Sequence, residues 1–385
     1  MTDCSPTLTR RAICAAPLLG AGLAAAGMAR AGGHGFETVF HFPRGESPTT
    51  RPLATPDAQG RRRLLNIVTA RLAWRIPLNG QADADDAFAV YHHAFSSFTL
   101  ASDGLAYGTR TRPGAGAVCR WDVPKGQSIE NVARLRNDRS EGTPPGGLIE
   151  GFDGALYGTA FGGGSHEVGT IFRTTTTGDL AVLHTFDFLP GEGHSPVGSL
   201  TRGDDGNYYG VTAQGGEFDP GTLYRMTPDG AVAFLYSFGQ GGANDGGLPA
   251  DGMTLAPDGL FYGMTPARGK HSSGTIYSLS HDGAYRSLHD FQAEEGRLPQ
   301  ATLFAMPDGR LYGTCGRGGA FDLGTVFRFR PERPGRIEVL HSFSGKDCDG
   351  ALPMAGLELA DDGNLYSTTR EGGLFGGGIL FRVRP

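Results

Sequence analysis

Residues 308–328 read DGRLYGTCGRGGAFDLGTVFR, and variants of this stretch recur almost to the end of the chain. The pair Asp308-Gly309 is typical of a tight turn, and the residues rich in aromatic and β-branched types at 310–314 and 324–328 predict two short strands. The glycine-rich residues 315–323 between them predict a long loop. We therefore interpret this stretch as one hairpin of a repeated β-structure.

The hairpin returns at a regular interval. The tyrosine of its first strand lies at Tyr107, Tyr157, Tyr209, Tyr262, Tyr312 and Tyr366, so successive copies are 50, 52, 53, 50 and 54 residues apart. The second strand ends in an aromatic–arginine pair or a weaker version of it, at Trp74-Arg75, Cys119-Arg120, Phe172-Arg173, Tyr224-Arg225, Tyr277-Ser278, Phe327-Arg328 and Phe381-Arg382. This count gives seven copies, of which the first is degenerate because Asn66-Ile67 stands in place of Tyr-Gly.

Two further segments complete each copy. One is a strand with a His/Tyr-x-Phe signature, found at His93-Ala94-Phe95, His184-Thr185-Phe186, Tyr236-Ser237-Phe238, His289-Asp290-Phe291 and His341-Ser342-Phe343. The other is a short apolar run before each Asp-Gly turn. Four strands in such a period are typical of a propeller blade. The sequence therefore predicts an all-β, seven-bladed β-propeller with four-stranded antiparallel blades.

The first and last segments suggest how the ring closes. The last copy ends with its third strand near Pro385, so it lacks the His/Tyr-x-Phe strand, and a strand of that type, FETVFHF, stands at residues 36–42. We expect residues 36–42 to complete the last blade beside residues 379–382.

Residues 1–31 have the features of an export signal. Arg10-Arg11 precedes a run from Ala12 to Ala29 that is rich in Ala, Gly and Leu, and Ala29-Arg30-Ala31 offers small residues for cleavage. The arginine pair indicates the twin-arginine type, with an ordinary secretory signal or a retained membrane anchor as alternatives. We therefore expect one domain, residues 32–385, in the periplasm or outside a bacterial cell, with no membrane span in the mature chain.

Charge excludes one class of partner. Without residues 1–31 the chain has 34 − 3 = 31 basic and 40 − 1 = 39 acidic residues, a net charge of −8. Because no basic stripe is present, nucleic acid is not an expected partner. We expect a monomer that requires no cofactor.

The mature chain has three cysteines. Cys119 occupies a strand position that is aromatic in other copies and is expected in the core. Cys315 and Cys348 fall in loops on the same face of a propeller, so a disulfide between them is one expectation and two separate thiols are the other.

The long loops define the face where a ligand is expected. The Asp-Gly turns lie at the bottom, whereas the glycine-rich loops and the connections between blades lie at the top, and long loops on a rigid scaffold commonly carry binding residues. The candidate ligand-binding residues there are His166, Glu167, His194, Asp219, Asp245, His271, Asp322 and Asp349. An ordinary polar surface is the alternative, and the sequence assigns neither catalytic residues nor a metal. The recurring His184, His289 and His341 are interpreted as structural because they appear once per blade.

The combined pattern L-H-S-F, D-G-x-x-P, D-G-x-L-Y-G-T, G-G and G-T-x-F-R resembles the GloVer-type tandem repeat of bacterial exported proteins, over residues 96–385. This resemblance implies a propeller at the cell exterior and no particular activity. The leading hypothesis is a module that binds an extracellular protein or carbohydrate with its top-face loops. The alternative is a metal-assisted lyase or hydrolase acting on a polysaccharide or similar substrate through His166, His194 and His271.

Overall fold

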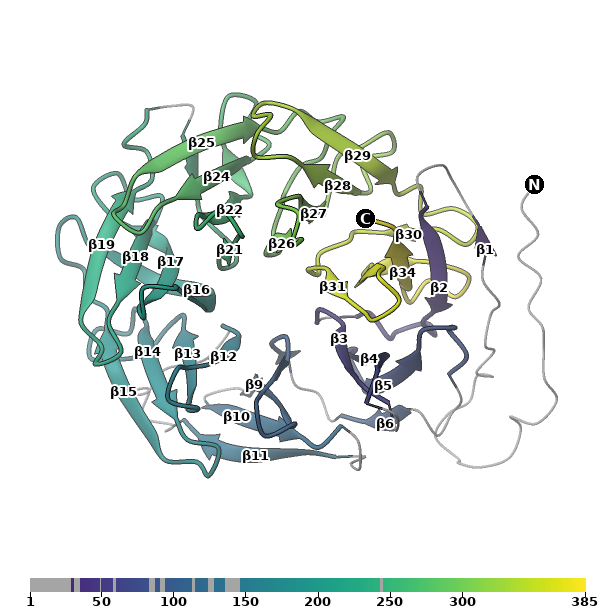
Figure 1. Ribbon diagram of the computed structural model, residues 1–385, viewed down its shortest axis with the longest axis horizontal. Coiled ribbons are helices and arrows are strands. Elements are labelled where there is room, and N and C mark those ends of the chain that lie inside the picture. Colours follow the sequence, from purple (N-terminus) through teal and green to yellow (C-terminus); the bar gives the residue numbers. More distant parts are fainter. Residues whose placement is uncertain are drawn as a thin grey trace.

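Each copy of the repeat folds into one small antiparallel sheet, and the sheets stand side by side around a ring (Figure 1). The computed structural model describes residues 29–30, 35–48, 50–57, 60–82, 87–90, 94–112, 115–123, 128–135, 146–242 and 245–385. The described residues form seven blade sheets and contain no helix, so none could cross a bilayer as an apolar helix. The prediction of a seven-bladed propeller is confirmed.

The strands of the first three blades follow one another along the chain. Blade 1 contains β3 (Leu53–Pro56), β4 (Arg62–Val68), β5 (Leu72–Pro77) and β6 (Ala87–Ala89). Blade 2 contains β7 (Ala94–Phe95), β8 (Thr99–Leu100), β9 (Ala106–Arg112), β10 (Ala115–Trp121) and β11 (Ile129–Arg134). Blade 3 contains β12 (Leu148–Glu150), β13 (Leu156–Ala160), β14 (Thr170–Thr174) and β15 (Leu180–Thr185).

The next three blades repeat this order. Blade 4 contains β16 (Gly193–Arg202), β17 (Tyr208–Gly215), β18 (Thr222–Met226) and β19 (Val232–Ser237). Blade 5 contains β21 (Thr254–Leu255), β22 (Phe261–Thr265), β24 (Thr275–Leu279) and β25 (Tyr285–Asp290). Blade 6 contains β26 (Phe304–Ala305), β27 (Leu311–Cys315), β28 (Thr325–Phe329) and β29 (Ile337–Ser342).

Blade 7 joins the two ends of the chain. It contains β31 (Glu358–Leu359), β32 (Leu365–Thr368), β34 (Ile379–Val383) and β2 (Glu37–His41), with β1 (Ala29–Arg30) at the outer edge of β2. Two short pairs lie outside the blade sheets, β20 (Gly246–Gly247) with β23 (Ala267–Arg268) and β30 (Gly350–Ala351) with β33 (Glu371–Gly372). Because β1 lies within the predicted export signal, we expect cleavage after Ala31 to leave a four-stranded blade.

The Tyr-Gly pair of the repeat has a packing reason. Gly313 pairs with Phe327 across two strands, and a Cβ at Gly313 would stand 2.5 Å from Cζ of Phe327. At Gly263 the same atom would stand 2.2 Å from the Tyr277 hydroxyl oxygen. Real Cβ contacts are never this short, so glycine is required where the aromatic ring of the third strand lies across the second. The glycine of Tyr-Gly and the aromatic residue of Phe-Arg therefore pack against each other in the interior of the blade.

The tyrosine itself fixes the turn that precedes it. The hydroxyl of Tyr262 donates to the carboxylate of Asp258 at 2.6 Å. The same contact joins Tyr107 to Asp103 (2.8 Å), Tyr157 to Asp153 (3.3 Å), Tyr209 to Asp205 (2.8 Å) and Tyr366 to Asp362 (2.7 Å). Each carboxylate satisfies a phenol whose ring is buried, which makes the Asp-Gly turn part of the core architecture.

The ring closes through β2, as predicted. This strand runs antiparallel along β34, with Glu37 opposite Arg382 and His41 opposite Ile379 (Figure 1). Glu37 Oε2 accepts hydrogen bonds from Arg382 Nη2 at 2.7 Å and Nε at 3.1 Å. The Phe36 ring stacks on His341 of blade 6 at 3.6 Å, while Phe40 packs against Trp74 of blade 1 at 5.3 Å. The closing strand therefore binds both neighbouring blades as well as its own.

The outer strand of blade 1 differs from the prediction. Ala94 and Phe95 pair with Thr111 and Arg110 of β9, so they belong to blade 2. The outer strand of blade 1 is β6 instead. The Val90 N–H donates to the Arg71 carbonyl, and the equivalent bond in blade 3 runs from the Phe186 N–H to the Gly169 carbonyl. Val90 thus occupies the phenylalanine position, and the assignment of the signature at 93–95 to blade 1 is wrong for Ala94 and Phe95, while His93 lies outside the described residues.

The predicted disulfide between Cys315 and Cys348 is also wrong. Cys315 is a free thiol and fully buried, because it is the last residue of β27 rather than part of the loop. A Cβ built at Gly296 would lie 2.4 Å from its Sγ, which shows that this thiol packs directly on backbone. Burial raises the pKa of the Cys315 thiol. Cys119 is likewise fully buried, as expected.

Lowering the pH is expected to weaken the closure of the ring. Burial lowers the pKa of His41 from 6.5 to about 4, and its Nδ1 accepts the Leu374 backbone N–H at 3.2 Å. Between these pKa values the unfolded chain binds a proton that the folded chain excludes. The free energy of unfolding should therefore fall by up to about 3 kcal/mol as the pH decreases through this window, with no contribution from His41 above it.

Urea unfolding at a series of pH values measures this effect. His41→Gln should flatten the slope between the two pKa values, whereas the control His271→Gln, on an exposed loop, should keep it. An unchanged slope in His41→Gln contradicts the role assigned to His41.

Candidate functional site

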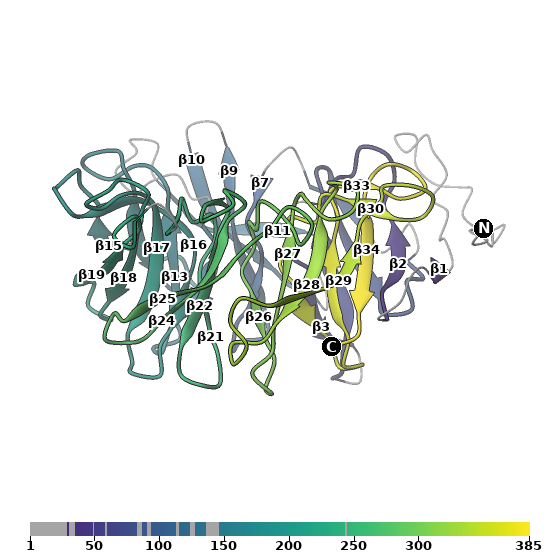
Figure 2. The same ribbon diagram turned by 90° about the horizontal axis from the view of Figure 1, so that it is seen from above.

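The loops that carry the predicted ligand-binding residues lie together at one edge of the ring, the upper edge in Figure 2. Here the second strand of each blade turns into the third, and each blade connects to the next. We call this edge the top face. The Asp-Gly turns lie at the opposite edge, so the assignment of loops to faces agrees with the expectation from strand order.

Asp219 and Asp322 stabilise the loops in which they lie. Both adopt a left-handed backbone, with φ of 71° and 53°. Asp219 Oδ1 accepts the Gly215 N–H at 3.2 Å, and Asp322 Oδ1 accepts the Gly318 N–H at 2.9 Å. Aspartate tolerates this conformation because its short side chain can bond to nearby backbone. These carboxylates therefore cap their own hairpins. Glu167 has the same left-handed backbone (φ 61°) at the corresponding turn of blade 3.

Asp349 anchors the connection between blades 6 and 7. It accepts His341 Nε2 at 3.0 Å, the Ser344 N–H at 2.8 Å and the Gly350 N–H at 2.9 Å. Burial opposes ionisation of this carboxyl, but the hydrogen bond and charge of His341 outweigh it and lower the pKa of Asp349. A group so fully bonded to its own protein has little capacity left for a ligand.

Asp245 has the same place between blades 4 and 5. It accepts the hydroxyls of Tyr236 and Tyr285, each at 2.7 Å, together with the backbone N–H groups of Gly239 and Gly246. Glu295 accepts His289 Nε2 at 3.0 Å in the next connection. The His/Tyr of the outer-strand signature therefore binds the carboxylate that follows it, which gives the structural role expected of His289 and His341 a chemical basis.

The histidines proposed for catalysis occupy different surroundings. His166 Nδ1 lies 3.2 Å from Asp187, and the His194 ring packs edge-on against Phe188 at 4.9 Å, so both border the connection after β15. Burial lowers the pKa of His194, and the charge of Asp219 opposes this shift. His271 is exposed on the loop before β24 in blade 5. Within the described ranges, no three His, Cys, Asp or Glu side chains are grouped so as to hold a metal ion.

A set of exposed apolar side chains was missed by the sequence analysis. Of the twelve large hydrophobic side chains that are exposed in the described residues, ten lie in top-face loops. They are Phe161, Phe188, Leu189, Phe218, Leu248, Leu298, Phe321, Met354, Leu374 and Phe375. The motif G-G-x-F recurs at Phe218, Phe321 and Phe375. An aromatic residue repeated in a loop rather than in a strand was the signal that could have revealed this surface.

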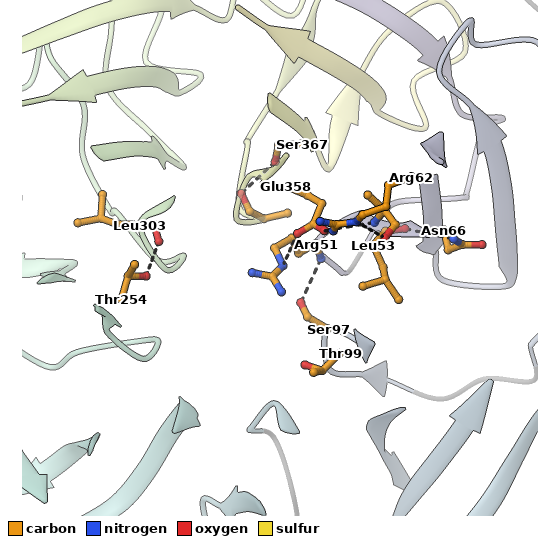
Figure 3. Close-up of polar contacts among 12 residues, drawn as sticks. Arg51, Leu53, Arg62, Asn66, Ser97, Thr99, Thr254, Leu303, Glu358 and Ser367 are labelled. Carbon is orange, nitrogen blue, oxygen red and sulfur yellow. Dashed lines mark hydrogen bonds and ion pairs between the residues drawn. The ribbon is translucent and has the colours of Figure 1, made fainter. Parts of the chain in front are cut away.

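The middle of the ring contains a second candidate site. The first strands of the blades enclose a cavity of about 440 Å³, with Arg51, Ser97, Ser199, Asp251 and Thr302 among its lining residues. Threonine hydroxyls join neighbouring first strands, as where Thr254 donates to the Leu303 carbonyl (Figure 3). Bonds of this kind connect blades 2 and 3, 4 and 5, and 5 and 6. None of the residues that line this channel was among the predicted ones.

Asp349→Asn is expected to destabilise the fold rather than abolish binding selectively. The asparagine side chain lacks the negative charge that pairs with His341. Its NH₂ group also replaces one acceptor oxygen and would face backbone N–H groups, which are donors themselves. The free energy of unfolding should fall by about 2–3 kcal/mol in urea. The matched control Asp347→Asn changes an exposed carboxyl two residues away and should lie close to the wild type. Equal stability of the two variants would show that Asp349 is not an anchor.

Solved structures of low sequence identity share the fold. A catalytically inactive variant of virginiamycin B lyase from Staphylococcus aureus with quinupristin is 16% identical, with 91% of this chain and 99% of that chain covered and a TM-score of 0.63. A streptogramin B lyase is 12% identical, covering 91% and 97%, with a TM-score of 0.59. A putative 6-phosphogluconolactonase from Bacteroides uniformis is 14% identical, covering 78% and 85%, with a TM-score of 0.51. At this identity the likeness concerns the fold alone.

A comparison with curated protein sequences gives no match. The family model described as the Gloeobacter/Verrucomicrobia repeat matches residues 85–265 and 206–385. These two overlapping matches span blades 2 to 6 and the C-terminal strands of blade 7, and they agree with the resemblance found in the repeat motifs. The chain belongs to the Gloeobacter/Verrucomicrobia repeat family.

Proposed function

We propose that this protein is an exported binding module that docks a protein partner on its top face. The observation that carries the proposal is that ten of the twelve exposed large hydrophobic side chains in the described part of the chain gather on that face. Soluble proteins rarely expose apolar side chains in such concentration unless the surface is used. Aromatic side chains and methionine are also enriched at the centres of protein interfaces.

The loops are suited to present these side chains. Phe218 and Phe321 lie in hairpins whose backbone is held by Asp219 and Asp322 through the hydrogen bonds to Gly215 and Gly318. A preformed loop loses little conformational entropy when a partner binds, so more of the contact energy is retained as affinity. The predicted carboxylates thus support a binding role indirectly, by shaping the loops.

The chemistry of the surface favours protein over carbohydrate. Five of the ten side chains are aliphatic (Leu189, Leu248, Leu298, Met354 and Leu374). Aliphatic side chains complement the apolar groups of another protein, whereas a sugar requires hydrogen bonds for most of its polar surface. The enzyme alternative is not favoured, because His271 lies on a loop of blade 5, apart from the connection after β15 that His166 and His194 border.

Removing the three loop aromatics should abolish docking. The triple variant Phe218→Ser, Phe321→Ser and Phe375→Ser removes side chains that are 46%, 53% and 36% exposed. Each such anchor commonly contributes about 1–2 kcal/mol or more to an interface, so affinity should fall by at least about a hundredfold. The measurement is chemical cross-linking in extracts of the native host's envelope, followed by mass spectrometry and titration of the recovered partner.

Phe152→Ser is the matched control. Phe152 is 54% exposed on the opposite face, so its replacement should leave capture of the partner unchanged. Sedimentation velocity of the wild type separates docking of another protein from self-association, which would contradict the expected monomer. Equal capture by the triple variant and the control would contradict the proposal, as would binding to cell-wall polysaccharide alone.

Export should depend on the arginine pair. Replacing both Arg10 and Arg11 by lysine keeps the charge of the segment but removes the feature typical of twin-arginine signals. We expect the uncleaved chain to accumulate in the cytoplasm, as seen by cell fractionation and by the mass of the N-terminal peptide. The single variant Arg30→Lys, beyond the apolar run, serves as the control. Undiminished export of the double variant would indicate an ordinary secretory signal.

A further inference from the structure

The channel wall contains one layer whose composition is uniform except at a single place. In each blade, one residue of the first strand pairs with the tyrosine position of the second, and the residue two places earlier defines one layer at the same level in all blades. Five members of this layer line the central cavity, namely Arg51, Ser97, Ser199, Thr302 and Gly356. The seven residues of this layer are Arg51, Ser97, Gly147, Ser199, Gly252, Thr302 and Gly356. Six of them are glycine, serine or threonine. Arg51 is the single large and charged member.

The side chain of Arg51 occupies space that is free because residue 356 of blade 7 is a glycine. A Cβ built at Gly356 would lie 3.3 Å from Arg51 Cδ, so the arginine lies across the glycine. Its guanidinium is directed toward the middle of the ring (Figure 3). The layer therefore provides both the space for a ligand and one cationic group that extends into it.

The charge of Arg51 is incompletely compensated. Its Nε is 3.8 Å from Glu358 Oε2, beyond hydrogen-bond distance, and this buried atom has no hydrogen-bond partner among the described residues. Glu358 Oε1 is already bonded to Arg62 Nη2 at 2.5 Å and to the Ala54 N–H at 3.3 Å. Two guanidinium groups thus share one carboxylate, and Arg51 is the one with free donors toward the cavity.

The other charged groups of the cavity have partners elsewhere. Asp251 accepts the backbone N–H groups of Gly252 at 2.8 Å and Thr302 at 2.9 Å. Glu150 accepts the Ser102 backbone N–H at 3.0 Å. The guanidinium of Arg202 lies over the Phe152 ring at 5.5 Å. Arg202 comes three residues after the layer residue Ser199, and its guanidinium stands on the Phe152 ring, so an anion within the layer itself would meet Arg51 as its cation. The carboxylates of Glu358, Asp251 and Glu150 oppose a high negative charge.

We propose that the central channel binds a small polyhydroxylated monocarboxylate, with its carboxylate on the guanidinium of Arg51. A planar guanidinium matches a carboxylate through two parallel hydrogen bonds. The hydroxyls of Ser97, Ser199 and Thr302 in the same layer can exchange hydrogen bonds with ligand hydroxyls. A cavity of about 440 Å³ is within the usual range for small-molecule sites. A dianionic phosphate is disfavoured by Glu358, Asp251 and Glu150, and the inference does not depend on docking at the top face.

Isothermal titration calorimetry with the full chain tests this assignment. The probes are D-gluconate and D-galacturonate, with D-galactose as the neutral match and inorganic phosphate as the dianion. The wild type should bind at least one sugar acid and should bind galactose and phosphate at least about tenfold more weakly, the difference expected for a charged hydrogen bond. Failure of both acids to bind the wild type overturns the proposal, and so does equal binding of galactose or phosphate.

Three variants locate the site. Arg51→Gln should weaken sugar-acid binding at least about tenfold, and Gly356→Ala should also weaken it by displacing the arginine arm without changing any charge. Arg202→Gln, which removes another arginine of the same cavity, should bind like the wild type. Thermal unfolding of each variant without ligand verifies that the ring is intact. Unchanged affinity in Arg51→Gln, or equal losses in Arg51→Gln and Arg202→Gln, would rule out the assigned contact.

Discussion

The pairing of β2 with β34 is the interaction on which the rest of the structure depends. Blades 1 to 6 are each built from segments that follow one another in the chain, whereas this pairing joins the two ends of the chain within one blade. The Thr38 hydroxyl, for example, donates to the carbonyl of Cys348, 310 positions away. The length-dependent cost of closing so long a loop is about 5 kcal/mol. Burial of Phe36, Phe40 and Phe42, at about 1.5–3 kcal/mol each, is of the size needed to offset it.

Closure also creates both candidate sites. Only a complete ring brings the first strands of seven blades around one axis, so the layer containing Arg51 does not exist until blade 7 stands beside blade 1. The contact between blades 1 and 7 shows this dependence, because Arg51 of blade 1 lies across Gly356 and faces Glu358 of blade 7. The top face depends on closure in the same way, since its apolar side chains come from successive blades whose spacing the ring sets.

The sequence was sufficient for the architecture because each signature has a local cause. The glycine of Tyr-Gly leaves room for the aromatic ring of the next strand, and the aspartate of Asp-Gly accepts a hydrogen bond from the tyrosine hydroxyl. The segment FETVFHF has the sequence of an outer strand but precedes the first complete blade. Prediction failed where register was needed. His93-Ala94-Phe95 matches the outer-strand signature in composition, yet the hydrogen bond of Val90 places the true strand earlier. Cys315 was assigned to a loop because nothing in the residue types shows that β27 extends one residue further. Arg51 could not be found at all without aligning first strands that share no motif.

Comparing the copies of the repeat distinguishes residues that the fold requires from residues that a ligand would require. Asp349, Asp245 and Glu295 recur because the connections after blades 4, 5 and 6 each provide an acceptor for the His or Tyr of the outer strand, so their recurrence reflects a structural requirement that these blades share. A ligand imposes the opposite pattern, because a small molecule on the ring axis cannot contact seven equivalent groups in the same way. It requires one blade to differ. Arg51 differs from six small residues at its level, and its charge is left without a full partner. In a propeller of this kind, the departure from the repeat is therefore a better indicator of a small-molecule site than the residues that the repeat preserves.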